Sequence, residues 1–278
     1  MRALLTIAHL TLHEAARRRI LTATLIGAVA FLVLYGIGFH FVARNIQQQA
    51  GPSALQQRFL LNFLTLAGLY ATHFLTLMTA VLLPVDTLSG EIASGVAQTL
   101  ASKPVRRSDI VLGKWLAFCT VTVAYFVVVA GGVLLLARLL GHFTPPGLAQ
   151  GLPLMAFEAV VFVSLSLAGG ARLSTVTNGI MAFGLYGLAF IGGWVEQVGT
   201  MAGNVAAQNV GTVASLIMPT EALWQRAAYY MQPSIMRDLN MTPFSAGSLP
   251  SPAMVWYAIG YALLALAWGI RGFRKRAL

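Results

Sequence analysis

The stretch DTLSGEIASGVAQTLASKPVRRSDIVLGK, residues 86–114, is a long polar segment set between two runs that are apolar enough to cross a membrane. Asp86 and Glu91 stand where a short helix would begin, and the helix dipole favours acidic side chains at that end. The segment brings acidic and basic side chains out of the membrane between two spans. It therefore predicts a membrane protein and the place where that protein contacts a partner inside the cell.

The same segment contains residues that would shape its backbone. Gly90 and Gly95 would allow another backbone to approach closely, because glycine has no side chain. Pro104 would end the helix, since proline lacks the amide hydrogen that the helix needs. These features favour a docking helix over an ordinary solvated loop, which is the alternative interpretation. A basic turn leads into the next span: Lys103, Arg106 and Arg107.

Composition places the chain among integral membrane proteins. Of its 278 residues, 58% are hydrophobic and 9% are charged, whereas a soluble domain has roughly 45–50% apolar and about 25% charged residues. A formal charge of +10 would suggest nucleic-acid binding in a soluble chain, but here the basic residues stand at the ends of apolar runs, where they set topology. We therefore expect no nucleic-acid partner. The single cysteine, Cys119, excludes an intrachain disulfide framework.

Six apolar runs are close to the length of about 20 residues that a helix needs to cross roughly 30 Å of hydrocarbon. The sequence therefore predicts an all-α membrane protein with six transmembrane helices in a single domain, residues 1–278. The predicted spans are residues 20–42, 59–83, 110–140, 148–170, 177–195 and 252–270.

The basic residues predict the orientation of these spans. Of the 18 Lys and Arg residues, 13 fall on one face of the membrane and five on the other. Because cytoplasmic loops carry an excess of basic residues, both termini are expected in the cytoplasm. The 13 are Arg2, Arg17, Arg18, Arg19, Lys103, Arg106, Arg107, Lys114, Arg172, Arg271, Arg274, Lys275 and Arg276, and the five are Arg44, Arg58, Arg138, Arg226 and Arg237.

Residues 1–19 predict an amphipathic helix that lies in the membrane interface before the chain turns inward. One helical face would be apolar and the opposite face polar and basic, which is typical of helices that lie flat on a bilayer. The predicted apolar face consists of Leu4, Leu5, Ala8, Leu12, Ala15 and Ala16.

Residues 196–251 form the longest connection between spans and would lie outside the cell. Two short helices are predicted within it, one over about residues 205–218 and one capped by Thr220, with Pro219 between them. Both would be re-entrant, and such backbone survives only when it is buried in protein or lines a cavity.

With these features the chain resembles the ABC-2 type permeases, in particular the six-span branch that includes the permease associated with nitrous-oxide reductase maturation. The resemblance covers essentially the whole chain. Its most specific elements are Ser89-Gly90-Glu91, Gly95, Ser102-Lys103-Pro104-Val105, Arg107 and Gly113-Lys114. In that family the loop between spans two and three, here residues 84–109, contacts an ATP-binding subunit. The docking residues implied by the resemblance are Asp86, Ser89, Gly90, Glu91, Gly95, Lys103, Pro104 and Arg107.

The resemblance implies a permease subunit of an ATP-driven transporter, and export, because the family mostly exports. The chain has no G-x-x-x-x-G-K-[ST] phosphate loop, since Gly113-Lys114 is followed by Trp115. It is therefore expected to be no enzyme and to bind no cofactor, with ATP and Mg²⁺ held by a partner chain. A short permease without a fused ATPase is typical of a prokaryotic plasma membrane.

The resemblance also implies that the first and fifth spans form the contact between two permease copies, in a complex of two permeases and two ATP-binding subunits surrounded by membrane lipids. Small residues allow helices to approach closely, and packing within one copy is the default alternative. The small residues are Gly27, Gly36 and Gly38 in the first span, and Gly184, Gly187, Gly192 and Gly193 in the fifth.

Glu158 lies near the middle of the fourth span and His73 near the middle of the second. An ionised acid at that depth costs at least about 2–3 kcal/mol, so such residues often mark a substrate or proton route. The opposing interpretation is that both are neutral or hydrogen-bonded groups that serve packing alone.

Two other classes of function remain open from the sequence. One is a mechanical complex, in which ATP hydrolysis acts on an extracytoplasmic partner through residues 196–251 without moving cargo. The other is a membrane enzyme that uses Glu158 and His73, although no nucleophile motif or metal set accompanies them. No group of side chains identifies a cargo.

Overall fold

The computed structural model describes residues 2–48, 54–95, 106–239 and 249–275. Within these ranges the regular structure is entirely helical, and six helices are long and apolar enough to cross a membrane. The predicted fold class is confirmed. The six helices are α2 (Arg19–Gln48), α3 (Ala54–Leu82), α6 (Arg107–Gly141), α7 (Leu148–Gly170), α8 (Thr175–Met201) and α12 (Pro252–Lys275).

The helix bounds match the predicted span at both ends for α7, while the other five helices are longer than their apolar runs. The extra turns consist of polar flanking residues, such as those that lead α2 to Gln48 and α12 to Lys275. An apolar run marks only the part of a helix that is compatible with hydrocarbon. It therefore underestimates the length of a helix that continues beyond the hydrocarbon.

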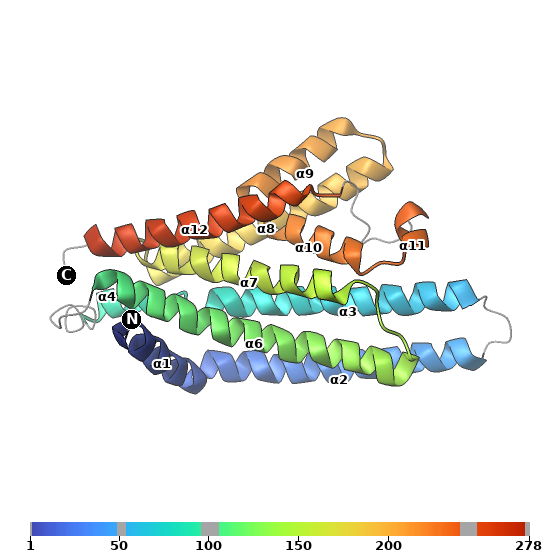
Figure 1. The fold of residues 1–278 in the computed structure, drawn as a ribbon, viewed down its shortest axis with the longest axis horizontal. Coiled ribbons are helices and arrows are strands. Elements are labelled where there is room, and N and C mark those ends of the chain that lie inside the picture. The colour runs from blue at the N-terminus through green and yellow to red at the C-terminus, as the bar shows by residue number, and fades with distance from the viewer. Residues whose placement is uncertain (1, 49–53, 96–105, 240–248, 276–278) are drawn as a thin grey trace.

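The spans lie side by side along the long axis of the molecule, with α7 in the interior and α2 at one edge (Figure 1). In the apolar window of α7, 67% of residues are buried within the chain, against 6% for α2. Helix α7 contacts α3, α6, α8 and α12. Both termini lie at one end of the bundle, as six spans require, together with the polar segment that follows α3.

The amino-terminal helix is present as α1 (Arg2–Arg17), and it packs along α6. Of its predicted apolar face, Ala8 and Ala15 are buried within the chain, whereas Leu5 and Ala16 are exposed on the outside of the bundle. Helix α1 lies close to α6, because a Cβ atom at Gly113 of α6 would lie 2.9 Å from Ile7 and from the carbonyl oxygen of Leu4.

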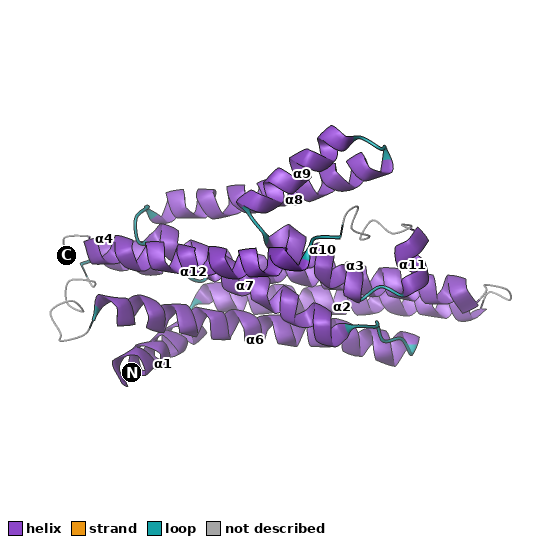
Figure 2. Cartoon of the chain, turned by 45° about the horizontal axis from the view of Figure 1, so that its top comes forward, coloured by secondary structure: helices purple, strands orange, loops and turns teal. Residues whose placement is uncertain are grey.

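The predicted helices between α8 and α12 are also present, as α9 (Val205–Ile217) and α10 (Thr220–Tyr230), followed by α11 (Ser234–Leu239). Thr220 is the first residue of α10 rather than its cap, because Pro219 occupies the cap position. Helix α9 folds back along α8 (Figures 1 and 2). Helix α10 packs against α7 and α8, with most of its residues buried.

Candidate functional site

A short helix, α4 (Thr87–Ala93), follows α3 in the predicted docking segment. Asp86 occupies its cap position but makes no capping bond; its carboxylate instead accepts a hydrogen bond of 2.6 Å from Arg18. Arg18 lies between α1 and α2, and it also donates to Glu14 at 2.6 Å and to the carbonyl of Leu83 at 3.2 Å. A single guanidinium thus joins α1, the end of α3 and the start of α4.

The charge of Arg18 is maintained by its partners. Partial burial by itself would lower the pKa of the guanidinium, but the bonds to Glu14 and Asp86 outweigh that effect and raise the pKa. The junction therefore keeps its charge at every physiological pH.

Glu91 points toward the bundle rather than into water. Its Oε1 atom contacts Nζ of Lys114 on α6, and the two side chains are only 18% and 4% exposed. A buried ammonium group needs a counter-charge, because an unpaired buried charge is strongly destabilising, and Glu91 provides it.

Ser89 joins α4 to the start of α8. Its hydroxyl lies 2.8 Å from the hydroxyl of Thr175. Nearby, the side-chain amide of Asn178 donates to the carbonyl of Val85 at 3.1 Å and to that of Ser166 at 2.8 Å. The end of α3 and the helix α4 are thereby bonded to α8, to the α1–α2 junction and to α6, and Asn178 connects this region to α7.

The other predicted docking residues serve different local roles. Gly90 has open space where a side chain would project, so no described residue approaches it closely. Gly95 follows α4 with a φ of +76°, a conformation that favours glycine. Arg107 donates to the carbonyl of Arg274 on α12 at 3.0 Å. Two of the predicted residues lie outside the described ranges: Lys103 and Pro104.

The structure brings His73 of α3 and Glu158 of α7 together in the interior. Nδ1 of His73 contacts Oε2 of Glu158, and the residues are 2% and 0% exposed. The imidazole is stacked against Tyr70, with 5.8 Å between ring centroids, and lies 5.5 Å from the ring of Trp224 on α10. Neither side chain reaches solvent in this conformation.

Another buried acid, Glu221 of α10, belongs to the same region and was missed from the sequence. It is 6% exposed and interacts electrostatically with His73, Glu158 and Glu196. Its side chain fills the space beside Gly193 of α8, where a Cβ atom would lie 2.5 Å from Cγ of Glu221. In the sequence Glu221 looks like an ordinary acid in the first turn of an outer helix, so its burial depends on the placement of α10.

Residues 5–278 match the family described as ABC-2 family transporter protein. The chain belongs to this family. It is therefore a multi-pass membrane subunit of an ABC transporter, with a transport role and an ATP-binding partner. A comparison with curated proteins found no match.

The predicted contact glycines of this ABC-2 permease divide into two groups. In the first group, a side chain would project into open space, so the position is free for contact with lipid or a second copy. In the second, the glycine is already used for packing inside the chain against Leu136, Ala214 or Glu221. The open positions are Gly27, Gly38, Gly184 and Gly187, and the internal ones are Gly36, Gly192 and Gly193.

Proposed function

We propose that this permease is driven by a separate ATP-binding subunit that docks on residues 84–109, and that it works as an exporter in a prokaryotic plasma membrane with both termini in the cytoplasm. The observation that carries the proposal is the bonding of the α4 region. Asp86 is bonded to Arg18 at the α1–α2 junction, Glu91 to Lys114 of α6, and Ser89 lies against Thr175 of α8. A movement of α4 would therefore be transmitted directly to α2, α6 and α8.

The proposal separates docking from transmission within the segment. The partner would contact the side of α4 that faces away from the bundle, where Ser94 is exposed, together with Lys103 and Pro104. Glu91 and Asp86 would transmit the movement to α6 and α2. ATP and Mg²⁺ would be held by the partner, whose closure would shift the spans between two conformations.

A charge exchange tests the transmission step. Glu91→Lys places two ammonium groups together and should reduce transport about tenfold or more, while the ATP-binding subunit still co-purifies. Lys114→Glu should do the same through two carboxylates. The double variant restores an opposite pair and should recover most of the activity.

The same experiment distinguishes transmission from docking. Loss of co-purification in Glu91→Lys, with no recovery in the double variant, would make Glu91 a direct contact of the ATP-binding subunit. Normal transport by both single variants would remove the pair from the mechanism.

We further propose that two copies assemble through the side of the bundle formed by α2, α3 and α8. Helix α3 contacts both of the others, and the open glycines of α2 and α8 would allow close approach. Two copies would then enclose a route that one six-span bundle lacks, in a complex of two permeases and two ATP-binding subunits. Replacing Gly184 with Leu should convert the detergent-solubilised dimer to a monomer, and an unchanged mass would contradict this interface.

His73 and Glu158 are proposed to belong to the translocation route. The support is their contact at mid-depth between α3 and α7, together with the nearby aromatic ring of Trp224 on α10. In the described conformation the pair is closed to solvent, so the proposal requires that α10 or α3 move during transport.

A mechanical role remains a second candidate because of α9. Val205, Val210 and Val213 of that helix are more than half exposed, although the helix is bound along α8. An extracytoplasmic partner that covers this surface would receive movement of α8 directly. Full transport of cargo by the permease and its ATP-binding subunit alone would exclude this candidate.

A further inference from the structure

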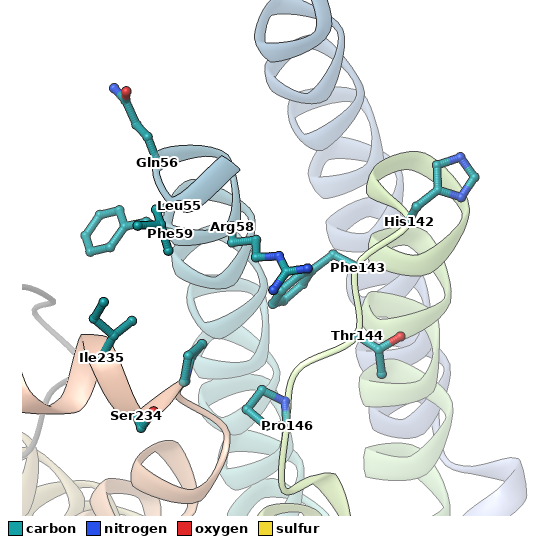
Figure 3. Close-up of a pocket in the computed structure, with 11 residues that line it drawn as sticks. Leu55, Gln56, Arg58, Phe59, His142, Phe143, Thr144, Pro146, Ser234 and Ile235 are labelled. Atoms are coloured by element: carbon teal, nitrogen blue, oxygen red, sulfur yellow. The ribbon is translucent and has the colours of Figure 1, made fainter. Parts of the chain in front are cut away.

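A pocket of about 770 Å³ lies at the end of the bundle opposite both termini. Three segments form its walls: the start of α3, the connection between α6 and α7, and the start of α11. Figure 3 shows Leu55, Arg58 and Phe59 on α3, Phe143 on the connection and Ile235 on α11. The volume falls within the range of roughly 300–1,000 Å³ that is typical of small-molecule sites.

The walls of this pocket are held in place by the end of α10, which leads into α11, so the pocket is formed in advance. Asn62 of α3 donates to the carbonyl of Met231, the residue that ends α10, at 3.1 Å. Gly147, at the end of the α6–α7 connection, lies so close to Tyr230 that a Cβ atom would stand 2.3 Å from its carbonyl oxygen. A preformed pocket loses less entropy when a ligand binds.

The backbone at the rim is a helix end. His142 ends α6 with a φ of +48°, the left-handed conformation in which many helices end, and the amide of Phe143 donates to the carbonyl of Ala137 at 3.3 Å. The His142 ring is directed away from Arg58 (Figure 3), so His142 shapes the rim and leaves Arg58 as the cation of the pocket.

The lining combines apolar walls with one guanidinium. Leu55, Phe59, Phe143 and Ile235 supply the apolar surface, and Arg58 extends from α3 toward Phe143 (Figure 3). No acidic side chain lines the pocket, and none of the ion pairs among the side chains that the structure describes involves Arg58. An apolar wall beside an unneutralised cation is complementary to a ligand with a hydrocarbon chain and an anionic head.

We propose that this pocket binds an anionic phospholipid, with the phosphate on Arg58 and part of an acyl chain against Phe59, Leu55 and Ile235. Arginine suits this role because its planar fork can bind two phosphate oxygens. The pocket lies where the spans end, which is the level of lipid headgroups. A small soluble anion would use Arg58 but would leave the apolar walls uncovered. The inference goes beyond the proposed function and does not depend on it.

Photolabelling of the full-length chain in detergent tests the proposal. The probe is phosphatidylglycerol with a diazirine in one acyl chain, and we expect labelled peptides that contain residues 55–59, 143–146 or 233–235. Arg58→Ala should reduce this labelling about tenfold, which corresponds to roughly 1.4 kcal/mol, and Arg58→Lys should retain part of it. Thr144→Trp, which places an indole in the pocket, should reduce labelling while Arg58 is still present.

The matched control is Arg138→Ala. Arg138 is an exposed arginine in the last turn of α6, at the same end of the bundle as Arg58, but it does not line the pocket. It should label like the parent protein, and equal melting temperatures would show that the variants are folded. Equal labelling of Arg58→Ala and the parent would overturn the proposal. So would equal labelling by a phosphatidylcholine probe, or displacement by inorganic phosphate as effective as that by unlabelled phosphatidylglycerol.

Discussion

At the scale of single residues, hydropathy does not show which partners the buried charged and polar side chains have. Lys114 and Glu91 neutralise each other near the end of the bundle that holds both termini, and His73 contacts Glu158 in its interior. Pairs of this kind contribute little net stability, but removal of one partner is costly because the other is left without compensation. Their presence therefore suits the proposed roles in transmission and transport.

Two substitutions at Glu158 separate a transport role from packing. Glu158→Gln keeps the shape of the side chain but cannot ionise, so it should impair transport while the melting temperature stays within a few degrees of the parent. Glu158→Leu should also impair transport, and it should lower the melting temperature, because the buried imidazole of His73 is left without a polar partner. The check is vesicle transport measured beside thermal unfolding. If both variants transport normally, Glu158 is a packing group, and the proposed role of His73 in the translocation route loses its support.

At the scale of elements, small residues decide which helices can lie together. Gly192 of α8 faces α9 so closely that a Cβ atom would lie 2.2 Å from that of Ala214. Gly211 of α9 fits against Glu196 in the same way. The turn between the two helices is stabilised by Asn204, whose side chain accepts hydrogen bonds from the first amides of α9. The α8–α9 hairpin therefore depends on a few positions where only glycine leaves enough room for the neighbouring helix.

The hairpin predicts opposite effects for the same substitution at two helical glycines. Gly192→Ala should lower the melting temperature, because the added methyl group forces α9 away from α8. Gly131→Ala, in α6, adds its methyl group in open space and should be neutral or stabilising, since alanine favours the helix by up to about 1 kcal/mol. Thermal unfolding and limited proteolysis of α9 measure the difference. Equal behaviour of the two variants would mean that the α8–α9 contact is unimportant.

At the scale of the whole molecule, the bundle places both termini and α4 together at one end and the turn between α8 and α9 toward the other (Figure 1). The distribution of basic residues predicts that the first end lies in the cytoplasm. This prediction agrees with the proposed docking, because an ATP-binding subunit that docks on α4 would meet it inside the cell.

Cysteine labelling tests the orientation. In a Cys119→Ser background, which removes only a buried thiol, Ala202→Cys should react with an impermeant maleimide in intact cells. Ser94→Cys should react only after permeabilisation, since both positions are exposed and the predicted topology places them on opposite sides of the membrane. Labelling in the reverse order would show that the orientation is opposite to the predicted one, and it would contradict the docking proposal.

Hydropathy patterns were sufficient for the span number and for the existence of α1, α9 and α10, because these depend on how each segment of the chain meets lipid or water. The orientation that the charge pattern indicates stays a prediction. The partners of Glu91 and Glu221 could not be predicted in that way, since each is neutralised or accommodated by residues of a different helix. Solvent preference is a property of one segment, whereas the neighbours of a side chain are set by how separate helices pack, and only their arrangement in space brings those residues together.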